Sequence, residues 1–189
     1  MKKIALICCC SLFLSACFGG RSPDPVFYKL SDGINAQTIS TQKTAILIND
    51  VKVPDLVFRP QIVLKSKKME EINISEFNRW AEPVPDMIKQ ALLDNLTKQL
   101  PNAFIKPNNY DASGHYNYSV LVEVNHFIGQ LKNNAQLDVW WTIKNTNGKV
   151  ITRKRFSDFT PIGDSYQSYV EGQSLLIEKL STEIAKSIK

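Results

Sequence analysis

The sequence predicts an α+β fold, in which a mostly antiparallel sheet carries two amphipathic helices packed on one face. Two observations support this fold class. Three consecutive segments between residues 116 and 159 alternate apolar and polar side chains, as strands do when one face is buried. Two other segments, 83–100 and 166–188, repeat their apolar residues at the helical period. Because the three alternating segments follow one another directly, we expect them to pair as an antiparallel meander.

Short strands are expected before the first helix. The candidates are residues 26–30, 44–53, 61–65 and 72–74, which are rich in Val, Ile and Leu. The polar segment 31–43 is rich in Ser, Thr, Asn and Gln and is expected to be a loop.

The first helix is expected over Pro83–Leu100. Pro83 and Pro85 suit a first helical turn, and Pro101 ends the helix. One side of this helix should face the sheet through Val84, Ile88, Ala91, Leu92, Asn95, Leu96 and Gln99. A short strand is expected next, at residues 103–106.

The three long strands are expected at residues 116–127, 137–143 and 150–159. In the middle strand, the inward residues are Leu137, Val139, Trp141 and Ile143. The turn 145–148 contains Asn-Gly, which readily adopts positive φ angles, and it predicts a hairpin. The final helix, 166–188, should bury a stripe made of Tyr169, Gln173, Leu176, Ile177, Leu180, Ile184 and Ile188.

The N-terminal residues have the layout of an export signal, with two lysines ahead of an apolar run. This run ends in Leu-Ser-Ala-Cys at 14–17, which resembles the lipobox of bacterial lipoproteins. The resemblance implies that residues 1–16 are removed as a signal peptide. It also implies that Cys17 becomes a lipidation site, with a diacylglyceryl group on sulfur and an acyl group such as palmitate on its amine. A transmembrane anchor is the alternative, but about a dozen apolar residues cannot span roughly 30 Å of hydrocarbon.

We expect residues 17–25 to form the lipidated Cys and a flexible tether, and residues 26–189 to form a single α+β domain. The tether contains two Gly and two Pro. Fully extended, its eight residues after Cys17 reach only about 25 Å. The domain should therefore lie close to its membrane.

Composition excludes several classes of function. The cysteines at positions 8–10 lie in the signal and Cys17 is consumed by lipid, so none remains for a disulfide, a metal or a nucleophile. The formal charge of +5 falls to about +3 without the two signal lysines. Because this charge is small, we interpret the basic runs at 65–68 and 153–155 as solvated surface, with no nucleic-acid partner.

No catalytic motif is recognisable in the sequence. It lacks a Gly-x-Ser-x-Gly elbow, a phosphate loop and a His-Glu-x-x-His pair. His115 and His126 are expected at opposite ends of one strand, where they cannot share a metal. We therefore expect no catalytic residue, no metal and no cofactor. A lipid hydrolase is the least favoured alternative, because no nucleophile–base pair is evident.

Two places stand out as possible partner-binding sites. Arg79 and Trp80 precede the first helix, and Arg and Trp are common in the hot spots of interfaces. The alternative is that Trp80 fills the junction between helix and sheet. Trp140 lies beside the inward Trp141, so strand alternation places Trp140 on the opposite face among polar residues. That position suits either an interface or a ring covered by a neighbouring side chain.

Several segments together resemble the PqiC-type family of ABC-type transport auxiliary lipoproteins. The resemblance rests on Val53-Pro54-Asp55-Leu56, Arg59-Pro60-Gln61-Ile62-Val63, Arg79-Trp80-Ala81-Glu82-Pro83, residues 92–101, residues 148–156 and the terminal helix. The family's hydrophobic or aromatic position near 57 is met by Val57 and Phe58. The resemblance covers nearly the whole mature chain.

The resemblance implies a non-enzymatic role in the bacterial envelope. Members of this family are expected at the periplasmic face of the outer membrane, held by their lipid anchor. Phe18 after Cys17 agrees with this, since Asp at that place favours inner-membrane retention. The implied partners are a periplasmic MCE-domain protein and inner-membrane transporter subunits, which move lipid between membranes and support membrane integrity. The resemblance also implies that the chain itself assembles into a ring-like homo-oligomer. The alternative is a lipoprotein that activates or scaffolds another envelope machine, such as cell-wall synthesis.

Overall fold

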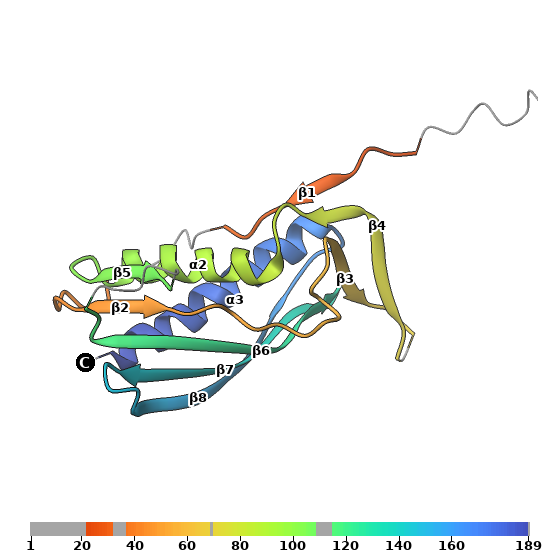
Figure 1. Cartoon of the computed structure of the whole chain (residues 1–189). Coiled ribbons are helices and arrows are strands. Elements are labelled where there is room, and N and C mark those ends of the chain that lie inside the picture. The colour runs from red at the N-terminus through yellow and green to blue at the C-terminus, as the bar shows by residue number, and fades with distance from the viewer. Residues whose placement is uncertain (1–21, 32–36, 69, 109–114, 189) are drawn as a thin grey trace, which may run out of the picture.

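The structure is a computed structural model that describes residues 22–31, 37–68, 70–108 and 115–188. In chain order its elements are β1 (Val26–Tyr28), β2 (Ala45–Ile48), β3 (Gln61–Lys65), β4 (Ile72–Trp80), α2 (Val84–Gln99), β5 (Phe104–Pro107), β6 (Tyr118–Gln130), β7 (Asn134–Asn145), β8 (Val150–Pro161) and α3 (Tyr166–Ser187). Both helices lie on one side of the long strands, and β1, β3 and β4 gather at one end of the molecule (Figure 1). The α+β class predicted from the sequence is confirmed.

The larger sheet has five strands in the order β5-β2-β6-β7-β8. β6, β7 and β8 pair antiparallel in sequence order, as the alternating segments predict. Gly148, with φ 75°, supplies the positive φ of the β7–β8 turn, whereas Asn147 does not. β2 departs from the expected pattern because it pairs parallel with both β5 and β6. The sheet is therefore mixed at one side and antiparallel across the rest.

The smaller sheet has three strands in the order β1-β4-β3. β1 runs parallel to β4, and β3 runs antiparallel to it. β4 extends to Trp80, well beyond the end predicted at Ile74, because a register shift lets the strand bend and continue. β2 is shorter than predicted and ends at Ile48, although both the backbone N–H and the side chain of Asn49 still donate to the Val120 carbonyl at 3.0 Å. The described residues thus form two sheets rather than the single sheet expected.

The helices bury the stripes that their periodicity predicts. α3 packs across β6, β7 and β8, and α2 packs against α3 and β5. A close approach of α3 to the sheet depends on Gly129, because a Cβ there would lie 2.8 Å from the Tyr169 ring. Buried stripe residues are Val84, Ile88, Ala91, Leu92, Asn95, Leu96 and Gln99 in α2, and Tyr169, Gln173, Leu176, Ile177, Leu180 and Ile184 in α3. Neither helix of the described part of the chain is long and apolar enough to cross a bilayer.

Candidate partner-docking site

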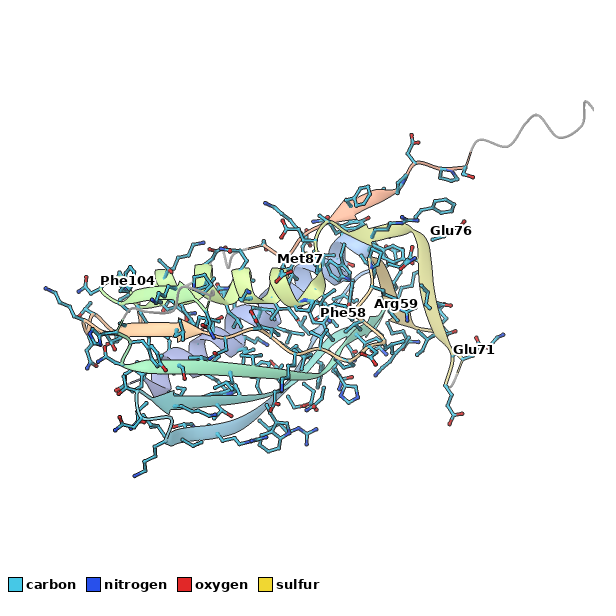
Figure 2. All side chains as sticks on the ribbon, in the orientation of Figure 1. Phe58, Arg59, Glu71, Glu76, Met87 and Phe104 are labelled. Atoms are coloured by element: carbon cyan, nitrogen blue, oxygen red, sulfur yellow. The ribbon has the colours of Figure 1, made fainter. Side chains whose placement is uncertain are left out.

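A pocket of about 280 Å³ opens where the connection into β3 meets the start of α2. One wall is the segment 58–60, and the other is the β4–α2 junction at residues 80–84. Figure 2 shows Phe58 and Arg59 beside one another on the chain that leads into β3. The pocket therefore joins two of the segments on which the family resemblance rests.

Trp80 forms part of this pocket from within the core. Its side chain is only 4% exposed, and its ring centroid lies 5.7 Å from that of Phe127 and 6.1 Å from that of Tyr169. This placement agrees with the alternative that Trp80 fills the junction between helix and sheet. The ring is therefore not an exposed anchor, because its surface is taken up by core contacts.

Phe58 is the exposed aromatic residue at the pocket, with 63% of its surface accessible. The sequence marks Phe58 only as a residue that can meet the hydrophobic or aromatic position of the family near 57, and not as a binding residue. Because an exposed Phe costs solvation free energy that a partner can recover, Phe58 is a better candidate contact than Trp80.

Arg59 brings a guanidinium group with an unsatisfied N–H donor to the same pocket. Its Nε is buried and has no hydrogen-bond acceptor among the described residues. Burying a donor without an acceptor costs about 1–3 kcal/mol. Arg79 takes a different position on β4, where its Nε donates to the Glu76 carbonyl at 3.2 Å. Both arginines remain candidate partner contacts, and Arg59 is the one that lines the pocket.

Trp140 lies on the face of β7 that the strand alternation predicts. It is 37% exposed, whereas Trp141 is fully buried. The Arg153 guanidinium lies 5.4 Å from the Trp140 ring centroid and 3.6 Å from a Glu123 carboxylate oxygen. One side of the ring is thus covered by a cation, and the remaining exposed part is a second candidate interface.

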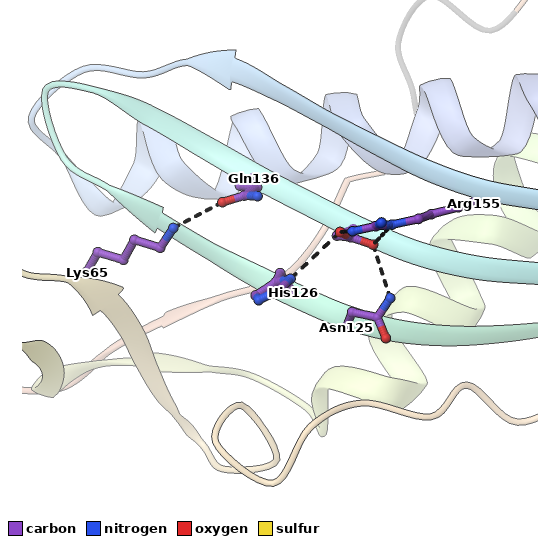
Figure 3. Close-up of polar contacts among 6 residues, drawn as sticks. Lys65, Asn125, His126, Gln136 and Arg155 are labelled. Atoms are coloured by element: carbon purple, nitrogen blue, oxygen red, sulfur yellow. Dashed lines mark hydrogen bonds and ion pairs between the residues drawn. The ribbon is translucent and has the colours of Figure 1, made fainter. Parts of the chain in front are cut away.

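A buried carboxylate organises the same face. Asp138 is 2% exposed and accepts hydrogen bonds from Asn125 Nδ2 at 3.1 Å and from Arg155, through both Nε and Nη2 (Figure 3). His126 Nδ1 lies 3.8 Å away. β6 continues past a bulge at Asn125 as far as Gln130. His126 therefore lies within the strand and not at its end as predicted. Hydrogen bonds from Arg155 lower the pKa of the Asp138 carboxyl, against the opposing effect of its burial.

We expect Asp138→Asn to lower the free energy of unfolding by about 1.5–3 kcal/mol at pH 7, because hydrogen bonds to a charged group are lost. A carboxyl whose folded-state pKa is depressed stabilises the fold above its unfolded-state pKa, and this stabilisation is lost as pH falls through the folded-state value. The difference between variant and wild type should therefore shrink below about pH 4. Urea denaturation at a series of pH values measures the free energy of unfolding of the variant and of the wild type. Asp164→Asn, at a carboxylate with 72% exposure, is the control and should change little. An Asp138 effect independent of pH would contradict the charge-based explanation.

The described residues hold no group of three or more His, Cys, Asp or Glu side chains placed to bind one metal ion. Cys17 lies outside the described residues, so its lipidation rests on the sequence alone.

Comparison with known proteins identifies the family. The sequence profile described as the ABC-type transport auxiliary lipoprotein component matches residues 28–185, and the chain belongs to this family. It is 23% identical over 190 residues to the intermembrane transport lipoprotein PqiC of Escherichia coli K12, an alignment that covers all of this chain and 98% of that protein. The PqiC of Shigella flexneri is similar to the same extent.

Two solved structures show the same fold. One is a crystal structure of an uncharacterised protein, with a TM-score of 0.73 and 20% identity, covering 88% of this chain and all of that one. The other is a protein from Xanthomonas campestris, with a TM-score of 0.65 and 12% identity, covering 85% of this chain and 93% of that one. At these identities the likeness establishes the fold alone.

Proposed function

We propose that the protein is an outer-membrane lipoprotein that acts as a non-enzymatic accessory subunit of an intermembrane lipid-transport system. The observation that carries this proposal is the family match over residues 28–185. The full-length similarity to proteins named intermembrane transport lipoprotein supports it. In this proposal the lipid on Cys17 holds the domain at the periplasmic face of the outer membrane. A periplasmic MCE-domain protein, connected to inner-membrane transporter subunits, is the partner.

We place the partner's docking site at the Phe58–Trp80 pocket, defined by residues 58–60 and 80–84. Its volume of about 280 Å³ lies just below the roughly 300–1,000 Å³ of pockets that enclose a small molecule, and it suits one or two inserted side chains. Arg59 and Glu82 both line the pocket, so a guanidinium and a carboxylate lie beside its apolar surface. A polypeptide carries both C=O and N–H groups, so a protein segment with an apolar side chain matches this chemistry.

Trp140 is proposed as a contact in self-association or partner binding. Its half-exposed ring and its Arg153 and Glu123 neighbours offer an apolar surface within a charged rim, which is the arrangement of many interfaces. This role is independent of the pocket, because Trp140 lies on the outer face of the larger sheet.

Phe58→Ser should weaken capture of the MCE-domain partner by about thirtyfold, since an interface aromatic contributes about 2 kcal/mol or more. The measurement is affinity purification of the full-length lipoprotein from solubilised envelopes, with quantitative mass spectrometry of the recovered proteins. Phe104→Ser is the matched control, because Phe104 is 66% exposed and Figure 2 shows it at the other end of the molecule.

The outcomes separate the possible functions. Retained capture by both variants would mean that the partner docks elsewhere. Recovery of cell-wall synthases in place of MCE-domain and transporter proteins would favour the alternative, an activator or scaffold of cell-wall synthesis.

A further inference from the structure

A second and larger hollow lies at the other end of the β3–β4 pair, beside the hairpin that joins the two strands. It has a volume of about 700 Å³ and lies between the β3–β4 hairpin and the outer face of β6. Figure 2 shows Glu71 at the far tip of this hairpin. The volume lies within the roughly 300–1,000 Å³ typical of sites for small organic ligands. We call this feature the hairpin groove.

The hairpin groove is held in shape by side-chain contacts between the two sheets. Lys65 Nζ, at the end of β3, donates to Gln136 Oε1 on β7 at 3.0 Å, as Figure 3 shows. Gln130 Nε2, at the end of β6, donates to the Ser66 carbonyl at 3.0 Å. These two hydrogen bonds fix the base of the hairpin over the outer face of the larger sheet. The groove is therefore built into the fold and does not depend on a chance arrangement of surface loops.

One part of the groove is apolar. Leu56 and Ile72 line it with 36% and 45% of their surfaces accessible, and Ile128 adds a buried side chain from β6. Ile72 belongs to the hairpin and Ile128 to the larger sheet, so apolar atoms face the groove from both sides. Exposed aliphatic side chains gathered in a hollow are typical of a site that binds an apolar ligand.

The other part of the groove is cationic. Lys65, Lys67 and Lys68 line it, together with the acidic side chains of Glu70 and Glu71. Glu71 is already engaged, because it lies 3.3 Å from Lys68 Nζ and accepts a hydrogen bond from Ser66 Oγ at 3.2 Å.

Three lysines and two glutamates line this part of the groove, which leaves an excess of one positive charge, and Lys65 and Lys67 form no ion pair among the described residues. Lys65 is hydrogen-bonded only to the neutral Gln136, and Lys67 has no acidic partner within the described residues. These two ammonium groups can therefore bind an anion, and such charge-assisted hydrogen bonds are stronger than neutral ones.

We propose that the hairpin groove binds an anionic amphiphile, a lipid with a phosphate in its headgroup. The phosphate lies against Lys65 and Lys67, and an acyl chain covers Leu56, Ile72 and Ile128. This inference extends the proposed function, since it gives the accessory subunit a lipid site of its own, separate from the pocket at Phe58. The groove combines an apolar wall with cations at one side, which neither a free phosphate nor a neutral hydrocarbon would fully satisfy.

The test uses the mature lipid-anchored protein in phosphatidylcholine nanodiscs. The probe is lysophosphatidylglycerol with a photoreactive diazirine on its acyl chain, and mass spectrometry maps the crosslinked peptides. We expect crosslinks on the peptides that contain Leu56, Ile72 or Ile128. Replacing both lysines, Lys65→Gln with Lys67→Gln, should lower the yield at subsaturating probe by about tenfold, since charge-assisted contacts are lost. Ile72→Ser should lower it as well.

Matched controls and a second lipid separate the possible results. Ile151→Ser and Lys149→Gln alter an aliphatic residue of similar exposure and a lysine near the distant β7–β8 turn, and they should leave the yield unchanged. Lysophosphatidylcholine with the same chain has a phosphate that its own choline ammonium neutralises, so it should crosslink less and respond less to the lysine changes. Equal labelling by both lipids, or equal losses in the controls, would overturn the proposal.

Two further arms test the source of the anion and the independence of the inference. Excess glycerol 3-phosphate should leave most of the labelling intact, and complete displacement would mean that the site binds free phosphate rather than lipid. The same variants are examined for capture of the MCE-domain partner, which should be unchanged. Lost labelling with intact capture supports the groove, whereas intact labelling with lost capture assigns the groove to the partner and overturns the proposal. Crosslinks confined to other surfaces would also overturn it.

Discussion

Trp141→Ala is expected to lower the free energy of unfolding by about 3–5 kcal/mol, whereas Trp140→Ala should have little effect on it. Trp141 is fully buried in the face of β7 that α3 covers, so truncation leaves a cavity that the surrounding strands cannot close. Trp140 already exposes 37% of its surface, and its main neighbour is the Arg153 side chain, which water can solvate after the ring is removed.

Thermal melts of a soluble variant that starts after Cys17 measure this difference. For a domain of this size, the Trp141→Ala loss corresponds to a fall in melting temperature of roughly 6–20 °C. Sizing chromatography on the same samples reports self-association, which Trp140→Ala should weaken.

Trp141→Phe is an informative companion variant. The indole Nε1 of Trp141 is buried and has no hydrogen-bond partner among the described residues. Phe keeps much of the apolar contact and removes an unsatisfied donor, so its cost should be far smaller than that of Ala. Equal destabilisation by Trp140→Ala and Trp141→Ala would show that both rings are structural, and the interface role proposed for Trp140 would be wrong.

The sequence predicts those parts of the fold that depend on local patterns. The alternation of Leu137, Val139, Trp141 and Ile143 identifies β7 and its buried face, because the period of two survives in any sheet. The helical stripes likewise identify α2 and α3, since each has several turns over which the period can be recognised. Long regular elements carry enough residues for the pattern to exceed chance.

Sheet membership depends on contacts between distant residues, and no local pattern encodes it. β1, β2 and β5 have only three or four residues each, and all their pairings are parallel with strands far away or across α2. Parallel pairing needs a crossover, so adjacency along the chain gives no guide to it. For this reason the second sheet and the parallel pairs were not predicted.

The polar sites show the same limit. Asp138 reads as an ordinary outward residue of a strand, and it becomes buried because Arg155 and Asn125 reach it from the two neighbouring strands. That contact requires the register of three strands and the bulge at Asn125. Phe58 and Arg59 form a pocket only because the fold brings their segment to the start of α2.

Cys17→Ala is expected to abolish lipid attachment and leave the uncleaved precursor. The prediction rests on the sequence Leu-Ser-Ala-Cys at 14–17, since the thioether to diacylglycerol needs the sulfur and cleavage follows lipidation in bacterial lipoproteins. Each buried CH₂ contributes about 0.8 kcal/mol to membrane binding, and stable anchoring needs more than one chain. Without the acyl chains, the mature domain would have no comparable hold on the bilayer. Metabolic labelling with an alkyne fatty acid, followed by gel mobility, measures both effects.

Fractionation of the envelope in a density gradient tests where the protein is located. Wild-type protein should band with outer-membrane markers. A Phe18→Asp variant should move toward inner-membrane markers if sorting follows the residue after the lipidated cysteine. Capture of the MCE-domain partner should fall in the Cys17→Ala strain even though the Phe58–Trp80 pocket is intact, because the proposed lipid anchor and its tether of eight residues, at most about 25 Å long, would no longer hold the domain near the partner. Maturation and membrane partitioning that persist in Cys17→Ala would contradict the lipoprotein assignment. Undiminished capture would show instead that docking at the pocket is strong enough without the anchor.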